Sequence, residues 1–266
     1  MIEPCLTLVI GKGGVGKTTV ARGLAELGAR GGARSLVIGY EPPDRRADGK
    51  VSFDVEAADG DAALRSVAGE LLGSARVAGA LLSHFAIRRL AAIVPGLREV
   101  ALLVLSLRYA EDGRHVVVDM PATGHGLAWL DTVRLLHALE PNGRARVLID
   151  RLEAKLADAA FTKLVVVTLS EPLVMAETLE LCRALPRSAD LVVVNGVHRP
   201  ARLPDDLLAA IAEVPRLTAA VASLRTWATP TASVPALGTA MCQLHRLSHR
   251  PTPAEVALAL STQVSS

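Results

Sequence analysis

Nine residues near the start of the chain have the types and spacing of a phosphate-binding loop. They read GKGGVGKTT from Gly11 to Thr19 and fit the pattern G-x-x-x-x-G-K-[ST]. Glycines in such a loop let backbone N–H groups close around phosphate oxygens, and Lys17 is expected to reach the β- and γ-phosphates. The hydroxyl of Thr18 is expected to bind Mg²⁺. The residues expected to contact the nucleotide are Gly11, Gly13, Gly14, Val15, Gly16, Lys17, Thr18 and Thr19.

The segments on either side of the loop are those that a phosphate-binding loop requires. Residues 6–10 are apolar and predict a short strand, and residues 21–32 carry apolar side chains at helical spacing. The positive N-terminal end of that helix would favour an anion. Because the whole pattern stands in this strand, loop and helix context, a chance glycine-rich turn is a poor alternative. The sequence therefore predicts nucleotide binding with Mg²⁺.

An aspartate, Asp119, ends a second apolar run that begins at His115. Sheets of parallel strands bind ligands at the carboxyl ends of the strands, which is where Asp119 would lie. We therefore predict that Asp119 holds Mg²⁺, directly or through water, together with Thr18. Taken alone, an aspartate in this place could equally be the N-cap of the next helix.

The remainder of the chain alternates strand-like and helix-like segments. This alternation predicts a single α/β domain over residues 1–266, with a doubly wound, mostly parallel sheet. Residues 61–111 and 126–160 could form a small, reduced helical subdomain. Apolar runs typical of strands buried on both faces are Ser35–Ile38, His115–Asp119, Leu164–Thr168 and Leu191–Asn195. Helices are predicted at residues 61–74, 78–93, 97–111, 126–139, 146–158 and 171–185, and further ones at Asp205–Val214 and Met241–Leu247.

The composition argues against several classes of protein. Half of the residues are hydrophobic, 21% are charged and the net charge is +2, which argues against disorder and against a strongly basic nucleic-acid platform. Aromatic residues make up 3%, too few for the stacking surfaces of single-strand nucleic-acid binders. No apolar run approaches the ~20 residues that span a bilayer, and no signal-peptide pattern opens the chain, so a cytoplasmic protein is expected. Three scattered cysteines without a Cys-x-x-Cys pair argue against a disulfide framework and a zinc site.

The loop holds a lysine that the ordinary motif does not need. Lys12 and Lys17 are two of only five lysines in the chain. A lysine at the place of Lys12 marks the deviant Walker A loop, and the segment resembles the SIMIBI-type P-loop NTPases that include ParA/MinD, nitrogenase iron protein and ArsA/Get ATPases. In that class the extra lysine reaches across a dimer interface. The resemblance implies a homodimer in which Lys12 contacts the phosphates bound by the other subunit, much as an arginine finger does.

The segment after Asp119 narrows the resemblance. Residues 120–127 read MPATGHGL and, with Asp119, resemble the D-T-A-P-T-G-H-T-L switch II segment of the ArsA/Get family. The matching residues are Asp119, Thr123, Gly124, His125 and Leu127. In that family this segment senses the γ-phosphate and couples its loss to opening of the dimer, in the manner of nucleotide switches. Without the flanking match, His125 would be interpreted as a surface-loop histidine.

Weaker matches extend the resemblance along the chain. Pro95–Gly96 with Glu99 resembles the family's P-G-x-x-E, and residues 168–180 resemble its V-T-x-P-E…E-T segment. Residues 191–195 (LVVVN) resemble the strand whose terminal asparagine reads adenine, and an amide side chain has the donors and the acceptor for that task. ATP is therefore the expected nucleotide and Asn195 an expected contact. The alternative for Asn195 is a turn-forming residue before Gly196.

The sequence departs from the ArsA/Get pattern in two places. The family's switch I begins S-T-D-P-A-H, and its aspartate positions the attacking water, whereas residues 39–44 here read GYEPPD. Glu41 falls on that aspartate and is one methylene longer, so hydrolysis could be fast, slow or absent, and Asp44 could serve instead. The Met-rich helical insertion that binds clients in Get-type targeting factors is also reduced, since residues 131–161 contain no methionine.

The sequence thus predicts a Mg²⁺-dependent, homodimeric ATPase switch of the ArsA/Get type, with Lys12, Glu41 and Asp119 as catalytic residues. It would couple ATP turnover to a partner or client protein that the sequence does not identify. The alternative is a ParA/MinD-like scaffold or positioning protein with little or no hydrolysis. Nothing points directly to nucleic acid, because the arginines are scattered. Residues 253–266 lack a basic amphipathic tail, so membrane contact is expected only through a partner.

Overall fold

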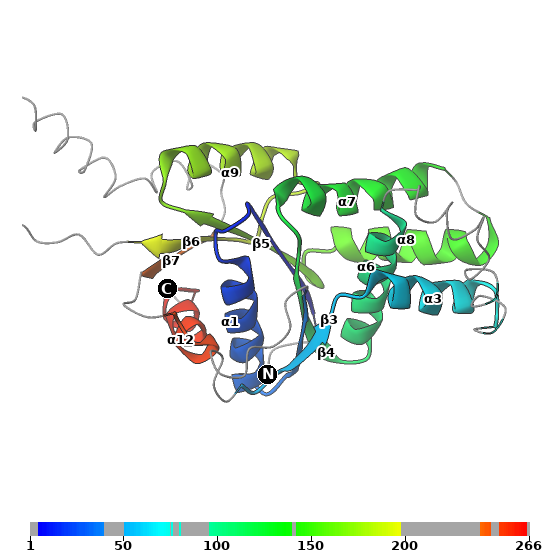
Figure 1. Cartoon of the computed structure of the whole chain (residues 1–266), viewed down its shortest axis with the longest axis horizontal. Helices are drawn as coiled ribbons and strands as arrows, with labels where there is room; N and C mark the ends of the chain where they lie inside the picture. The colour runs from blue at the N-terminus through cyan, green and yellow to red at the C-terminus, as the bar shows by residue number, and fades with distance from the viewer. Residues whose placement is uncertain are drawn as a thin grey trace, which may run out of the picture.

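The computed structural model describes residues 5–39, 51–74, 76, 80, 96–139, 142–197, 240–245 and 250–264. Within these residues the protein is an α/β fold with seven strands in one sheet and seven helices (Figure 1). The strands are β1 (Leu6–Gly11), β2 (Arg34–Gly39), β3 (Asp54–Ala57), β4 (Arg114–Asp119), β5 (Thr162–Leu169), β6 (Leu191–Val197) and β7 (Ala240–His245). The helices are α1 (Lys17–Arg30), α3 (Gly60–Leu71), α6 (Leu97–Glu111), α7 (Thr123–Ala138), α8 (Gly143–Ala157), α9 (Pro172–Ala184) and α12 (Pro253–Val264).

The sheet is parallel throughout and places β1 at its centre. The strand order is β3-β2-β4-β1-β5-β6-β7, so β1 lies between β4 and β5. Val9 of β1 is paired with Asp119 of β4, and Gly11 of β1 is paired with Val167 of β5. Parallel strands have their carboxyl ends at a common edge. The loop that leaves β1 therefore begins beside Asp119 and beside the end of β5.

Both faces of the central part of the sheet are buried, which explains why β1, β4, β5 and β6 are apolar along most of their length. Side chains alternate between the faces with a period of two. Leu6, Leu8 and Ile10 of β1 belong to the core formed with α6, α7 and α8. Val9, between them, belongs to the second core, to which α1 and α12 contribute. The predicted α/β architecture with a parallel sheet and helices on both faces is confirmed.

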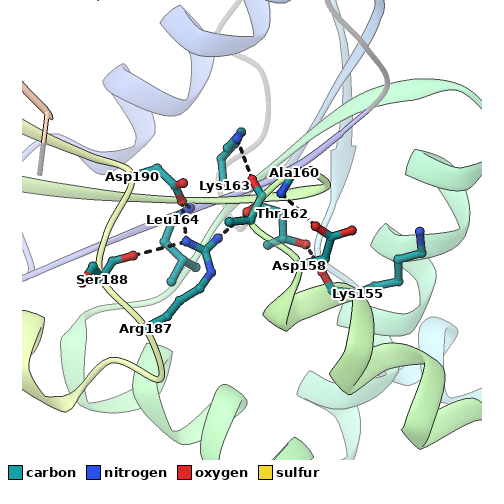
Figure 2. Close-up of polar contacts among 10 residues, drawn as sticks. Lys155, Asp158, Ala160, Thr162, Lys163, Leu164, Arg187, Ser188 and Asp190 are labelled. Atoms are coloured by element: carbon teal, nitrogen blue, oxygen red, sulfur yellow. Dashed lines mark hydrogen bonds and ion pairs between the residues drawn. The ribbon is translucent and has the colours of Figure 1, made fainter.

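Polar contacts fix the amino end of β5, which is the end opposite to the glycine-rich loop (Figure 2). The guanidinium of Arg187 donates to the carboxylate of Asp190 at 2.8 Å and to the carbonyl oxygens of Ser188 and Thr162. Asp190 also accepts the backbone N–H of Leu164 at 2.7 Å. Arg187 and Asp190 thus join the segment after α9 to the start of β5, just before β6 begins. This cluster sets the position of β5, whose other end is paired with Gly11, and of β6, whose other end carries Asn195.

A buried histidine lies between the central strands and α1. His115 of β4 is 6% exposed, and its ring nitrogens are 3.4 Å from the hydroxyl oxygens of Thr7 and Ser35. α1 packs closely against the ring at Gly28, where a Cβ would stand 2.1 Å from Nδ1 of His115. Burial lowers the pKa of His115 from 6.5 to about 4. The imidazole is therefore neutral in the folded protein at neutral and mildly acidic pH.

Mild acid is expected to destabilise the fold through His115. Because the folded-state pKa is depressed, its favourable contribution is complete above pH 6.5 and is lost as the pH falls toward 4. The free energy of unfolding should fall by about 1 kcal/mol between pH 6.5 and pH 5.5 from this residue alone. Urea unfolding at the two pH values would measure the fall in the wild type and in His115→Asn. Equal falls in the two proteins would contradict the assignment.

Most predicted elements are confirmed, with ends shifted by a few residues. The segment Met241–Leu247 was expected to be helical, and this prediction is wrong, because Ala240–His245 forms β7. Cys242 and Leu244 are buried, whereas Met241 and Gln243 are half-buried, which is the alternation of a strand. β7 pairs with β6. β3 and α12 were not predicted from the sequence.

Other predictions fall on parts of the chain that the structure does not describe. The expected helix at Asp205–Val214 lies outside the described residues, and so does nearly all of the one at 78–93. The helices of residues 61–111 and 126–160 share a core with the sheet where they are described, and a subdomain there stays a prediction. Among the helices that can be described, none combines the length and the apolar character needed to cross a bilayer.

Candidate functional site

The glycine-rich loop lies between β1 and α1, as the sequence predicted. It leaves the sheet at Gly11 and enters the helix at Lys17, with Gly16 as the N-cap. Gly14 and Gly16 have φ values of +81° and +92°, a region that residues with a side chain rarely adopt. Val15 between them is buried and belongs to the second core. One apolar side chain thus anchors a backbone turn whose shape depends on glycine.

Two glycines of the motif have no room for a side chain. A Cβ on Gly11 would stand 2.3 Å from the carbonyl oxygen of Val167, its partner in β5. A Cβ on Gly16 would stand 2.2 Å from Nδ2 of Asn195 at the end of β6. The loop is therefore packed against the ends of β5 and β6. No acidic residue lies in the first turn of α1, so the N–H groups there present a positive end to the loop.

Lys17 turns back over the loop that precedes it. Its ammonium donates a hydrogen bond to the carbonyl oxygen of Lys12 at 3.0 Å. Burial lowers the pKa of Lys17, and the charge of Asp119 opposes that shift. The side chain therefore brings a partly desolvated positive charge to the concave side of the loop. A cation in such surroundings attracts an anion more strongly than one in bulk water does.

Thr18 at the start of α1 and Asp119 at the end of β4 are brought together by the fold. The Thr18 hydroxyl donates to Oδ2 of Asp119 at 2.6 Å. Asp119 is only 7% exposed and ends β4 beside Val9. The N-cap of α7 is Ala122, so Asp119 does not have the alternative role of capping that helix. The carboxylate is directed instead to the start of α1.

The oxygens of this pair suit Mg²⁺. Mg²⁺ prefers hard oxygen ligands and is usually held by one or two protein groups, with phosphates and water completing its shell. A hydroxyl and a carboxylate 2.6 Å apart beside a phosphate-binding loop match that donor set. Thr18 and Asp119 are therefore the residues that would hold the ion. Elsewhere among the described residues, no group of three or more metal-ligating side chains is found.

Asn195 holds the loop from the side of β6. Its Nδ2 donates to the carbonyl oxygen of Val15 at 2.8 Å, and its Oδ1 accepts the N–H of Gly196 at 2.9 Å. Gly196 has a φ of +68°, so the asparagine also stabilises a local turn. The contact with Val15 was not predicted from the sequence. A role of Asn195 in reading adenine stays a prediction.

Replacing Asn195 by alanine should weaken nucleotide binding whatever the base. Loss of the bond to Val15 frees the loop, and a neutral hydrogen bond of this kind is worth about 0.5–1.5 kcal/mol. We expect the dissociation constants of ATP and GTP each to rise by about 3- to 10-fold. Titration calorimetry would measure both, with Asn142→Ala at the exposed start of α8 as the matched control. A loss confined to ATP would assign Asn195 to the base rather than to the loop.

Lys12 has a partner within its own chain. Its ammonium forms an ion pair with the carboxylate of Glu177 in α9, and both side chains are 42% exposed. In the sequence, Glu177 stands out only as part of the segment 168–180 that resembles the ArsA/Get family. No local spacing could have revealed the pair, because it joins the loop after β1 to a helix after β5.

The remaining predicted site residues are placed only in part. Thr123, Gly124 and His125 form the first turn of α7, four to six residues after Asp119, and their side chains lie outside what the structure describes. Glu41 and Asp44, the two candidates for positioning water, fall outside the described residues. Thr19 lies in the first turn of α1 and is half-buried. The structure therefore brings together the loop, Asp119 and Asn195.

Comparison with known proteins leaves the site to be interpreted from its own geometry. No protein-family model matches the chain, and no curated protein is significantly similar to it in sequence.

Proposed function

We propose that this protein is a Mg²⁺-dependent ATPase that acts as a homodimeric switch of the ArsA/Get type. The observation that carries the proposal is the loop itself, placed between the central strand and α1, with the Thr18 hydroxyl 2.6 Å from Asp119 of the neighbouring strand. Sequence motif, topology and polar geometry agree at this one place. Each is required for binding a nucleotide phosphate beside Mg²⁺.

The proposed roles follow from where each side chain lies. The loop amides and the Lys17 ammonium bind phosphate oxygens, and Thr18 with Asp119 holds the metal. Mg²⁺ held there would neutralise charge on the phosphates as the bond to the leaving group breaks. Asn195 keeps the loop in its binding shape through Val15. The resemblance adds Lys12 acting across the dimer, Glu41 positioning the attacking water, and His125 within switch II.

The wider setting is proposed on sequence grounds. We propose that the protein works in the cytoplasm and passes the energy of its cycle to a partner or client protein. The specific class of P-loop NTPase and its kinship with the ArsA/Get family rest on the motifs at Lys12 and at residues 119–127. Contact with a membrane would come through that partner.

Hydrolysis and assembly should be measured together over a range of protein concentrations. We expect phosphate release that requires Mg²⁺ and rises with the fraction of dimer. Sedimentation with ADP and with a non-hydrolysable ATP analogue would show that fraction. A protein that neither releases phosphate nor assembles in response to nucleotide would refute the proposal.

The same experiment tests the second candidate function. Glu41 stands where the resembled family has an aspartate, and an extra methylene displaces a carboxylate by more than a catalytic site tolerates, roughly half an ångström. An ATP-bound dimer without turnover would therefore favour a scaffold or positioning protein. In that case Glu41→Asp should raise the rate of hydrolysis above that of the wild type.

A further inference from the structure

Lys12 is held at both ends by its own chain. Its carbonyl oxygen accepts the Lys17 ammonium at 3.0 Å, and its ammonium is paired with the Glu177 carboxylate. The residue that the proposed mechanism needs on a second subunit is therefore directed, in the single chain, at a carboxylate of the same subunit. The carboxylate lies far from Lys12 in the sequence, and α9 places it beside the loop.

Glu177 lies on a helix that packs firmly against the sheet. The next residue, Thr178, is 7% exposed, and its hydroxyl is 2.8 Å from that of Thr168 in β5 and donates to the carbonyl oxygen of Val174. Met175, earlier on the same helix, is buried in the core. These contacts fix α9 on β5 near the carboxyl ends of the strands, where the loop leaves β1 (Figure 1).

The position of the loop is equally defined. Gly11, next to Lys12, is hydrogen-bonded into the sheet beside Val167, the residue before Thr168. The lysine and the glutamate therefore start from backbones fixed to the same pair of strands. An exposed ion pair between two mobile side chains is often worth nothing, whereas fixed backbones reduce the entropy lost when the pair forms.

We propose that Glu177 is a positioning residue that keeps Lys12 within its own subunit, so that the nucleotide-dependent dimer forms only when this ion pair opens. The inference rests on the proposed function, because it gives Lys12 a second position in the partner's site. Glu177 touches no nucleotide in this account and acts only through Lys12. The pair sets the protein concentration at which the switch closes.

The expected effect is moderate because the pair is exposed. Exposed ion pairs contribute about 0.2–1 kcal/mol, which is roughly 1.4- to 5-fold in an equilibrium constant. Two pairs open for each dimer. Glu177→Gln should therefore lower the dissociation constant of the nucleotide-bound dimer by between about 2- and 30-fold. Glu177→Asp keeps the charge on a shorter stem and should lie between the two.

The first measurement reports the ion pair without any nucleotide. Reductive methylation followed by peptide mass spectrometry gives the rate at which the Lys12 amine reacts, with the Lys155 amine as an internal standard. Removing the carboxylate should make Lys12 react faster in Glu177→Gln. Glu180→Gln, an exposed residue three positions later in α9, is the matched control and should leave the rate unchanged.

The second measurement is sedimentation equilibrium with Mg²⁺ and adenylyl imidodiphosphate on the same three proteins. Faster Lys12 modification together with a tighter dimer in Glu177→Gln alone would support the proposal. An unchanged Lys12 rate would overturn it, since the pair would not form in solution. A faster rate with an unchanged dimer constant would also overturn it and leave a purely structural ion pair. Absence of a dimer in the wild type and in Glu177→Gln would refute the homodimeric switch itself.

Discussion

Lys17→Ala is expected to raise the dissociation constant of Mg-ATP by about 100-fold. The Lys17 ammonium turns back over the loop and donates a hydrogen bond to the carbonyl oxygen of Lys12. Hydrogen bonds to charged groups are worth about 1.5–3 kcal/mol, and alanine would remove them all. Calorimetric titration of the wild type and the variant measures the loss directly.

A lysine remote from the loop provides the control for net charge. Lys163 lies in β5 near its amino end, away from the loop, and its ammonium donates to the carbonyl oxygen of Ala159. Lys163→Ala changes the charge of the protein equally and should bind Mg-ATP like the wild type. Equal weakening in the two variants would mean that Lys17 contributes only general attraction.

The pKa of Lys17 provides a second test, the pH dependence of ATP binding by the wild type. Burial lowers this pKa below the ordinary value of 10.5, so alkali should remove the positive charge earlier than from an exposed lysine. The affinity for ATP should fall as the pH rises through that range, because only the ammonium donates to phosphate oxygens. Lys17→Ala should lack this fall.

Much of the fold could be predicted because its strands are buried on both faces. Continuous apolar runs such as Val116–Val118 have few other interpretations, and the glycine motif located the first strand, the loop and the first helix. The edge of the sheet was harder. β3 and β7 carry half-buried or exposed residues, so their patterns are short and mixed, and β7 was predicted as a helix.

The candidate site divides in the same way between local and distant contacts. The motif predicted Lys17 and Thr18, and the position of Asp119 at a strand end predicted its meeting with Thr18. The contacts of Asn195 with Val15 and of Lys12 with Glu177 join segments far apart in the sequence. Such contacts depend on strand order and register, which no single stretch of residues encodes.

Gly16→Ala should disable the loop more severely than its small size suggests. Alanine at a φ of +92° is strained by about 1–2 kcal/mol, and the new Cβ would stand 2.2 Å from Nδ2 of Asn195. Moving that amide breaks its bond to Val15 and forces a shift costing about 1–3 kcal/mol more. We expect the free energy of unfolding to fall by about 3 kcal/mol and ATP binding to be lost with the loop shape.

Two companion variants separate strain from collision. Gly14 has a φ of +81°, and within the described part of the chain no atom of a more distant residue lies within 4 Å of the place that a Cβ would take. Gly14→Ala should therefore lose only the strain, about 1–2 kcal/mol in urea unfolding. Asn195→Ala added to Gly16→Ala removes the atom that the new methyl group meets. The double variant should therefore be more stable than Gly16→Ala alone, although each substitution by itself destabilises. If the losses in the free energy of unfolding from the two substitutions simply add, β6 does not constrain the loop. The hydrogen bond from Asn195 to Val15 would then have no part in nucleotide binding.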